Sequence, residues 1–294
     1  MKKLTLPLGA LSACIVLFLT ATTFSACVKT KVEKDTVTVH DTTTKNLTDT
    51  VTKNVTDTVN TCCCKNVTNG LVAYYTFTNG SLADSSGRKN DIVQNNNATL
   101  TADRFGNANC AYSFDGSSSF LRVADSASLR FDTAVSLMAI FKANAYYMGY
   151  CPANNILSKG ANDYASGFYC LRFGAITGCG NPVDTSTEEI MAGYGDNSAV
   201  PADAGDNSAY FSTGVWYNVI YTYGNGVCKL YVNGILVDTE TITATSGYNT
   251  QDLFIGKHGD PTYPYYLNGT IDEVRIYNRA LNATEVNTLN NLTR

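Results

Sequence analysis

Hydrophobic and polar positions alternate along most of the chain after residue 70, and turn residues separate the alternating runs. A period of two is typical of β-strands, because successive side chains point to opposite faces. In the run at 271–277, apolar residues are interleaved with Asp272, Glu273 and Arg275. We expect one face of that strand to pack and the other to face water. Further strands are predicted at 71–77, 111–114, 120–123, 135–142, 155–159, 167–173, 189–193, 216–223, 227–232, 235–237 and 252–256.

The residues between these runs predict how the strands connect. Asp115-Gly116 lies between two of them and predicts a hairpin of 111–114 with 120–123. Asn233-Gly234 predicts a second hairpin, since Asn-Gly between alternating runs is a strong turn signal. Asn282, followed three residues later by Glu285, predicts a capping box that starts one short helix.

Several of these phrases resemble one known family. The run GTIDEVRIYNRAL from Gly269 resembles the closing strand of laminin G-like domains of the concanavalin A-like lectin/glucanase superfamily. The W-Y-x-V and L-Y-V-N-G phrases within 216–237, and D-S-S-G at 84–87, resemble that family too. The resemblance covers residues 71–289. It implies an all-β fold, a two-sheet antiparallel jelly-roll sandwich, so we assign residues 71–294 to a laminin G-like domain.

The first 26 residues resemble a bacterial lipoprotein signal peptide. After Lys3 the segment is mostly apolar and carries no charge before Lys29, as in export signals. Phe24-Ser25-Ala26-Cys27 resembles a lipobox, which implies lipidation of Cys27. We therefore expect an exported lipoprotein of the outer membrane or cell surface, of Bacteroidota type, that meets the membrane only through its lipid anchor. Cleavage by ordinary signal peptidase is the alternative.

Residues 27–70 form a Thr-rich linker in our interpretation. The segment is dominated by Thr, Val, Asp, Lys and Asn and has no Phe, Trp or Tyr to nucleate a core, so we expect a disordered, extended stalk. An eight-residue repeat occupies 45–52 and 53–60. Four tripeptides resemble the acceptor sites of Bacteroidota O-glycosylation, with ordinary linker composition as the alternative. The implied glycan positions are Thr36, Thr42, Thr50 and Thr58.

Composition excludes some partners. The formal net charge of −4 and the pI near 5.2 argue against nucleic acid as a partner. In an exported chain, ten cysteines favour disulfide chemistry, although their connectivity is left open. The cysteines beyond the signal segment and lipobox are Cys62, Cys63, Cys64, Cys110, Cys151, Cys170, Cys179 and Cys228.

Catalysis has little support in the sequence. Glucanases of the superfamily carry E-x-D-x-x-E on one strand, because two carboxylates must flank the glycosidic bond. No such triplet occurs here, and strict alternation would place the adjacent Asp272 and Glu273 on opposite faces. The chain has only two histidines, which leaves little material for a Ser-His-Asp site. We expect a protein without catalytic activity, and a glycosidase of unrelated geometry is the alternative.

Calcium is the cofactor that the resemblance implies. Similar laminin G-like modules hold a structural Ca²⁺ between the opening loop and the closing strand, where oxygen ligands gather. The residues implicated in this chain are Asp84, Asn90 and Asp272. An Asx-turn at Asp84 and a surface charge at Asp272 are the alternatives. The loop that carries Asp196, Asp203 and Asp206 is a second candidate.

Carbohydrate binding is the leading functional hypothesis. Sugars require aromatic platforms beside polar groups, because stacking supplies contact area and hydrogen bonds set orientation. One loop before the closing strand concentrates such residues, which are Tyr263, Tyr265, Tyr266, His258 and Asp260. A second tyrosine cluster contains Tyr146, Tyr147 and Tyr150, and loop packing would explain either cluster equally well. Adhesion to a surface protein is the alternative function.

Overall fold

The computed structural model describes residues 31–39, 47–55, 67–146, 153–163, 165–175, 188–194, 212–241 and 247–292. The chain divides into two compact units, Met1–Cys64 and Lys65–Arg294. Within the described ranges, no helix has the length and apolar character needed to cross a membrane. The predicted lipidation site Cys27, the candidate glycan sites Thr42 and Thr58, and the cysteines at 62–64 lie outside them.

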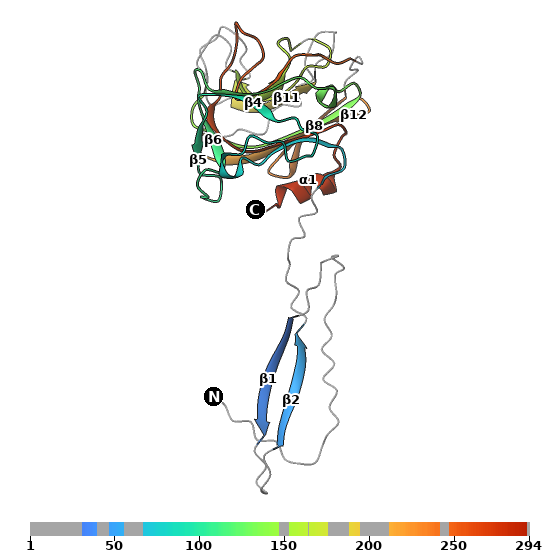
Figure 1. Cartoon of the computed structure of the whole chain (residues 1–294). Coiled ribbons are helices and arrows are strands. Elements are labelled where there is room, and N and C mark those ends of the chain that lie inside the picture. Colours follow the sequence, from blue (N-terminus) through green and yellow to red (C-terminus); the bar gives the residue numbers. More distant parts are fainter. Residues whose placement is uncertain are drawn as a thin grey trace. The chain divides into compact units, whose positions relative to one another are not determined.

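The described residues of the first unit form one pair of strands. Strand β1 (Lys31–Val39) pairs antiparallel with β2 (Leu47–Val55), as Figure 1 shows. The sequence predicted a stalk without secondary structure, and the structure differs in this segment. Alternating β-branched Thr and Val residues favour an extended, paired backbone, which accounts for the difference. Two of the predicted glycan sites, Thr36 and Thr50, lie opposite each other in the register.

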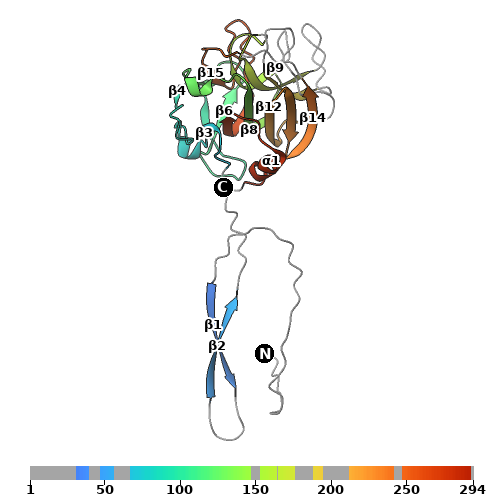
Figure 2. The same cartoon turned by 90° about the vertical axis from the view of Figure 1, so that its right-hand side faces the viewer.

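The second unit is a sandwich of two antiparallel sheets (Figures 1 and 2). The larger sheet has the order β14-β13-β12-β8-β16-β6-β5, and β3 also pairs with β16. Its strands are β3 (Leu71–Tyr75), β5 (Thr99–Thr101), β6 (Ala111–Asp115), β8 (Ala134–Ala143), β12 (Trp216–Gly224), β13 (Val227–Val232), β14 (Ile235–Thr241) and β16 (Asn268–Tyr277).

The smaller sheet has six strands in the order β11-β10-β9-β15-β7-β4. These are β4 (Ile92–Asn96), β7 (Phe120–Val123), β9 (Ala153–Lys159), β10 (Tyr169–Ala175), β11 (Glu188–Tyr194) and β15 (Leu253–Ile255). Two 3₁₀ turns, at Thr78–Gly80 and Ala127–Leu129, and one α-helix, α1 (Ala283–Asn290), complete the described elements of this unit.

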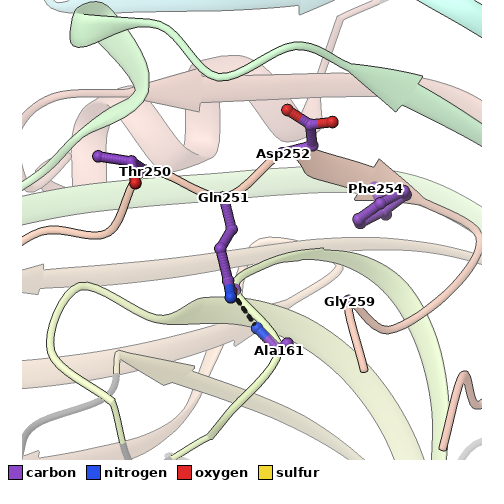
Figure 3. A pocket seen from close by; sticks show the side chains of 7 residues that line it. Ala161, Thr250, Gln251, Asp252, Phe254 and Gly259 are labelled. Atoms are coloured by element: carbon purple, nitrogen blue, oxygen red, sulfur yellow. Dashed lines mark hydrogen bonds between the residues drawn. The ribbon is translucent and has the colours of Figure 1, made fainter. Parts of the chain in front are cut away.

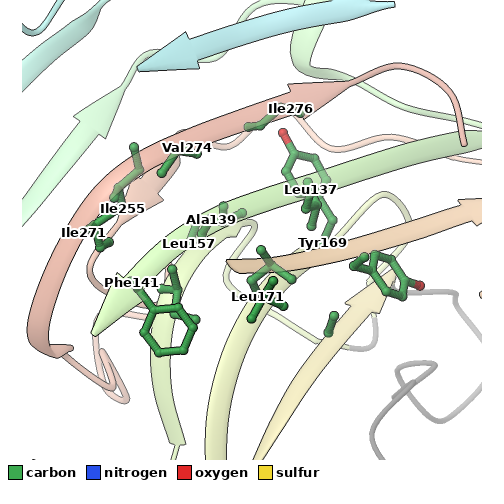
Figure 4. Packing of buried hydrophobic residues seen from close by; sticks show 14 of the residues in the cluster. Leu137, Ala139, Phe141, Leu157, Tyr169, Leu171, Ile255, Ile271, Val274 and Ile276 are labelled. Carbon is green, nitrogen blue, oxygen red and sulfur yellow. The ribbon is translucent and has the colours of Figure 1, made fainter. Parts of the chain in front are cut away.

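The main hydrophobic core lies between the two sheets. Leu137 and Phe141 of β8 share this core with Leu157 of β9 and Leu171 of β10, and all four side chains are fully buried (Figure 4). Phe141 also stacks on Phe173, with 5.7 Å between ring centroids. Burial of apolar side chains from both inner faces is what holds two sheets together. The predicted all-β, two-sheet antiparallel sandwich is confirmed.

The outer face of β16 is also buried, which the sequence did not predict. Val286 and Leu289 of α1 form a second apolar cluster with Tyr277 of β16 and Met138 of β8. The prediction that this face of β16 meets water is wrong, because the helix that follows the strand folds back over it. The predicted capping box is confirmed, since the Asn282 side chain accepts from the Glu285 N–H and the Glu285 carboxylate accepts from the Asn282 N–H.

The charged residues of β16 are ion-paired within this covered face. The Arg275 guanidinium contacts the Glu273 carboxylate at 2.6 Å and donates to the Tyr74 hydroxyl at 2.9 Å. Asp272 is paired with Arg104, also at 2.6 Å. Burial by itself disfavours the charge of Arg275, but the adjacent Glu273 outweighs that effect and raises the pKa of the guanidinium.

A bulge places Asp272 and Glu273 on the same side of the strand. The register with β8 shifts between Ile271 and Glu273, and the core-facing residues Ile271 and Val274 are three positions apart. Both carboxylates therefore lie on the outer face, and the expectation that they point to opposite faces is wrong. An extra residue in one strand breaks strict alternation, and the sequence pattern does not reveal it.

The predicted hairpin of 111–114 with 120–123 is also wrong. Strand β6 belongs to the eight-stranded sheet and β7 to the six-stranded sheet, so the chain crosses between layers at this point. Asp115 fixes the crossing, because its Oδ1 accepts the backbone N–H groups of Ser117, Ser118 and Ser119. Such an Asx-type turn occurs both in a hairpin within one sheet and in a crossing from one sheet to the other. Turn residues alone therefore do not predict which of the two forms.

Candidate ligand-binding surface

The loop between β15 and β16, residues 256–267, carries the predicted ligand-binding residues and is named here the tyrosine loop. Its base is closed by a hydrogen bond from the Leu267 N–H to the Gly256 carbonyl, at 2.9 Å. The Asn155 N–H of β9 donates to the Tyr265 carbonyl at 3.0 Å. Tyr265 itself has a φ of +40°, an uncommon conformation for a residue with a side chain. The loop is therefore fixed to β9, an inner strand of the six-stranded sheet.

Two tyrosines of this loop form an aromatic pair at the surface. The rings of Tyr263 and Tyr265 stack with 6.1 Å between centroids and 18° between planes. Tyr263 is 46% exposed, whereas Tyr265 is half-buried and packs against the His258 ring at 5.9 Å. Tyr266 is half-buried in the same loop. An exposed ring supported by a second ring is suited to stacking against a sugar.

A buried charged cluster supports the aromatic pair. Nε2 of His258 lies 2.8 Å from Oδ1 of Asp163, and the Arg172 guanidinium contacts Oδ2 of the same carboxylate at 2.6 Å. Burial would raise the pKa of Asp163, but the hydrogen bond from His258 and the charge of Arg172 outweigh it and lower the pKa to about 2. Asp163 is therefore an anion at neutral pH, and it ties the tyrosine loop to β10.

Asp260 shapes the tip of the loop. Its N–H donates to Nδ1 of His258 at 3.1 Å, and its Oδ1 accepts the Thr262 N–H at 2.7 Å. The structure thus brings Tyr263, Tyr265, His258 and Asp260 together as the sequence predicted. Asp260 and His258 hold the loop in shape, and Tyr263 is the residue of this set that presents an exposed ring.

A pocket of about 330 Å³ adjoins the tyrosine loop (Figure 3). Gly259 of the loop lies against Gly160, since a Cβ on Gly259 would stand 2.1 Å from the Gly160 carbonyl oxygen. The Gln251 side chain accepts a hydrogen bond from the Ala161 N–H across the pocket. Polar groups and one aromatic ring share the wall, which is lined by Gly160, Ala161, Thr250, Gln251, Asp252, Phe254 and Gly259.

The wall of the pocket is anchored to the six-stranded sheet. Asp252 is paired with Arg122 of β7 at 2.8 Å, and its other oxygen accepts the Asp125 N–H at 2.9 Å. These pocket residues were not predicted from the sequence, because β15 was recognised only as a short strand. One sequence signal for the pocket is Phe254. It is an aromatic residue between Leu253 and Ile255, and alternation places it on the face opposite to these two core residues.

The three predicted calcium ligands are engaged by groups of the chain itself. Asp84 accepts four hydrogen bonds, from the N–H groups of Tyr74, Ser86 and Asn90 and from the Ser86 hydroxyl. The Asn90 amide oxygen accepts from the hydroxyl groups of Ser126 and Ser128.

Asp272 is the third of these residues, and Arg104 neutralises it. Oxygens of all three residues therefore accept hydrogen bonds from the chain, which anchor the opening loop at Asp84 and Asn90, and the calcium site stays a prediction. The described residues also contain no group of three or more acidic, histidine or cysteine side chains placed to hold a metal ion. The loop with Asp196, Asp203 and Asp206 lies outside the described ranges.

The cysteines and the second tyrosine cluster are described in part. Cys110, Cys170 and Cys228 are buried. The Cys228 sulfur lies 3.0 Å from the Tyr221 hydroxyl, and burial raises the pKa of this thiol to about 11. Tyr146 packs against Phe173 of the core. Tyr147, Tyr150, Cys151 and Cys179 are outside the part of the chain that the structure describes, so the disulfide prediction stays a prediction.

Comparison with known proteins agrees with this fold. Residues 180–287 match the model of the laminin G-like family described as the concanavalin A-like lectin/glucanases superfamily. A domain of this superfamily is therefore supported. No match was found among curated proteins.

Solved structures with the same fold include toxin domains and a domain of a glycan-degrading enzyme. The binding domain of Paraclostridial Mosquitocidal Protein 1 has a TM-score of 0.58 at 17% identity, covering 76% of this chain and 52% of that chain. A structure of botulinum neurotoxin type C, whose cell entry is described as dependent on interaction with two ganglioside molecules, has a TM-score of 0.57 at 16% identity. The match covers 77% of this chain and 52% of that chain. This chain thus spans about half the length of the toxin domains.

The enzyme domain is matched over nearly its whole length. Domain 4 of AbnA, a GH43 extracellular arabinanase from Geobacillus stearothermophilus, was solved in complex with arabinotriose. It has a TM-score of 0.51 at 21% identity, and the match covers 74% of this chain and 97% of that chain. At these identities, the likeness to both groups shows the sandwich fold.

Proposed function

We propose that the folded domain is a glycan-binding module without catalytic activity, and that the tyrosine loop and the adjoining pocket form its binding surface. The observation that carries this proposal is the Tyr263–Tyr265 pair, an exposed ring stacked on a half-buried one. His258, Asp163 and Arg172 hold that pair in place, so little ordering is needed when a sugar binds. Preorganised aromatic rings beside polar groups are typical of sugar sites.

The comparisons support the same class of ligand. Domain 4 of AbnA, which is similar over almost its full length, was solved with a bound arabino-oligosaccharide. The neurotoxin structures are described with gangliosides or with SialylT, although this chain matches only half of each. Arabinotriose is therefore the first probe, followed by an array of neutral and acidic glycans.

The test is calorimetric titration of the mature protein with arabinotriose and with any glycan that the array identifies. We expect Tyr263→Ala to weaken binding about tenfold, since stacking of one ring contributes on the order of 1 kcal/mol. The matched control is Phe105→Ala, which removes an exposed aromatic ring that contacts Arg104, the ion-pair partner of Asp272. The proposal would be contradicted if no glycan on the array bound, or if both variants lost the same affinity.

Protein adhesion is the second candidate function, and the edge strand β14 favours it. Ile235 and Leu236 are 68% and 47% exposed, and β14 is the last strand in the order of the eight-stranded sheet. An exposed apolar edge is suited to pairing with a strand of another protein. Ile235→Asp should abolish adhesion to a host or bacterial surface protein while leaving sugar binding unchanged. Adhesion that survives this change would exclude β14 as the adhesive edge.

We also propose that the protein is an exported lipoprotein anchored at Cys27, with O-glycans on Thr36, Thr42, Thr50 and Thr58. The lipobox-like sequence and the Asp-Thr tripeptides support this. Intact mass of the protein from its native host should exceed the mass of the chain from Cys27 onward by lipid and glycan. A mass equal to the unmodified chain would contradict both modifications.

The calcium prediction is tested separately. Because the oxygens of Asp84, Asn90 and Asp272 already accept hydrogen bonds from the chain, calcium binding there would require these partners to move. Thermal unfolding with added Ca²⁺ and with EDTA measures this directly. A melting temperature that rises in Ca²⁺, with no such rise in the Asp84→Asn variant, would support the site. Identical curves in Ca²⁺ and EDTA would contradict the calcium prediction.

A further inference from the structure

The outer face of the six-stranded sheet carries aromatic and charged side chains other than those of Tyr263 and Tyr265. In the register, Phe254 of β15 lies opposite Arg122 of β7 on one side and Ser158 of β9 on the other. Leu253 and Ile255, which flank Phe254, point into the core. Because side chains alternate, Phe254 and its cross-strand neighbours lie on the outer face, where the pocket of Figure 3 opens.

Two aromatic rings and one ammonium group meet on this face. Phe120 and Phe254 contact edge to face, with 5.8 Å between centroids and 74° between planes. Nζ of Lys257 lies 4.4 Å from the Phe254 centroid and 4.8 Å from the Phe120 centroid. All three side chains are half-buried, so each is still reached by solvent. The rings bind the cation by cation–π attraction, which fixes its position.

Lys257 differs from Arg122 and Lys159 because no carboxylate of the described residues is paired with it. Arg122 is paired with Asp252 at 2.8 Å, and Lys159 with Asp125 at 2.8 Å. Among the residues that the structure describes, no carboxylate lies within ion-pair distance of Lys257. Burial lowers the pKa of Lys257, which shows that its charge is held in a partly desolvated position. An anion placed there would offset that loss of solvation.

The pocket and the ammonium group share one residue. Phe254 forms part of the pocket wall and also contacts Nζ of Lys257. The same wall contains the side chains of Thr250 and Gln251, whose polar groups are able to form hydrogen bonds with the hydroxyl groups of a sugar. An aromatic ring, hydroxyl-binding groups and an unpaired cation are together complementary to a sugar that bears a carboxylate.

We propose that this face is a second glycan subsite, specific for an acidic sugar. The carboxylate pairs with Lys257, the sugar ring packs against Phe254, and hydroxyl groups bind Gln251 and Thr250. This inference rests on the proposed glycan-binding function and deepens it by naming the class of sugar. It divides the proposed binding surface into two parts, since none of these residues belongs to the Tyr263–Tyr265 pair.

The test compares trigalacturonic acid with its methyl ester, which has the same sugar rings without the charges. Calorimetric titration of the mature protein should show the acid binding about tenfold more tightly than the ester, since a charge-assisted contact in a partly desolvated site contributes at least this much. The preference should shrink as salt is added, because salt screens the attraction. The ester should show no comparable dependence on salt.

Variants of Lys257 locate the effect. Lys257→Met keeps most of the apolar stem and should abolish the preference for the acid, while Lys257→Arg should retain it. The control is Lys142→Met, because Nζ of Lys142 also lies over an aromatic ring, that of Trp216 at 5.1 Å, but on a strand of the other sheet. Melting temperatures establish that each variant is folded, and Lys142→Met should leave the preference unchanged.

The outcomes separate this inference from the function on which it rests. Equal affinity for acid and ester, or a preference that persists in Lys257→Met, would overturn the acidic subsite. If a neutral glycan still bound through Tyr263 in that case, the proposed function would stand alone. Failure of every glycan on the array to bind would overturn both.

Discussion

The outer faces of the two sheets differ in how their charges are satisfied. On the eight-stranded sheet, α1 covers the face, and Glu273 and Arg275 are buried and paired with each other. On the six-stranded sheet, Lys257 lies half-buried over two partly exposed rings. One face is closed by the chain itself, whereas the other presents aromatic and polar groups to the surroundings.

This difference separates stability from recognition within one sandwich. Buried, paired charges leave no group available to a ligand, and removing either partner leaves the other without compensation. Partly exposed rings and a cation without a counter-charge contribute less to stability and are available for binding. Substitutions on the covered face should therefore change the free energy of unfolding, and those beside Lys257 should change affinity.

The largest effect is expected for Glu273→Ala on the covered face. This change leaves the Arg275 guanidinium buried without its carboxylate, and should lower the free energy of unfolding by about 3–5 kcal/mol. Chemical denaturation monitored by tryptophan fluorescence measures it. The double variant Glu273→Leu/Arg275→Met is the control, since it removes both charges and should recover most of the loss. A single variant as stable as the parent would show that the pair is not needed.

A smaller loss is expected for Gly259→Ala at the boundary of the tyrosine loop and the pocket. The new Cβ would collide with the backbone of Gly160, 2.1 Å away, and should cost about 1–3 kcal/mol. Because the collision moves one wall of the pocket, glycan affinity should fall as well. The exposed neighbour Thr262→Ala serves as the control and should change stability by less than about 0.5 kcal/mol. Unchanged affinity in Gly259→Ala would place the ligand elsewhere.

Acid should weaken the support of the tyrosine loop by a comparable amount. The pKa of Asp163 is about 2 in the folded protein, against an ordinary value of 3.8 for an aspartate. The folded state therefore binds this proton less tightly, and the stabilisation is complete above pH 4 and lost as the pH falls towards 2. One pKa unit corresponds to about 1.4 kcal/mol, so the loss attributable to Asp163 is about 2 kcal/mol.

The measurement for Asp163 is a series of denaturation curves between pH 5 and pH 2. Hydrogen bonds also lower the pKa values of other carboxylates, including Asp115 and Asp125. The informative quantity is therefore the difference between the parent and Asp163→Asn. This difference should shrink as the pH falls, and a constant difference would contradict an ionised Asp163.

The smallest effect is expected at the cap of the helix that covers the eight-stranded sheet. Asn282→Ala removes the side chain that accepts the Glu285 N–H, and should cost about 1 kcal/mol. Thr284→Ala, in the first turn, is the matched exposed control. Hydrogen exchange of the α1 amides provides a local measure, and equal exchange in both variants would show that the cap does not hold the helix.

Much of the fold could be predicted from local patterns. The runs at 216–223 and 227–232 alternate, and they form β12 and β13 as neighbours. Within the sandwich, two strands were missed, β4 and β5, because their side chains are mostly exposed and polar and show no apolar alternation. The hairpin error at Asp115-Gly116 has a different cause, since turn chemistry fixes a change of direction but not the sheet to which the next strand belongs.

The candidate site was predicted in part for similar reasons. Tyr263, Tyr265, His258 and Asp260 are close in sequence, so a short loop was certain to hold them near one another. Asp163 and Arg172 are distant in sequence and meet His258 only because β9, β10 and β15 are neighbours. Lys257 has no distinctive sequence signal, and its significance appears only beside Phe120, which comes from a strand far earlier in the chain.

The sequence by itself determined most strands of the sandwich, the capped helix and the concentration of tyrosines before the closing strand, because these depend on residues within a few positions of each other. Tertiary structure decided which charges are paired and which are left without a partner charge. Glu273 lies within a strand, and Lys257 follows closely after one. The folding of α1 over the eight-stranded sheet makes Glu273 a structural residue. The contacts of Lys257 with Phe120 and Phe254 on the six-stranded sheet make it a candidate for recognition.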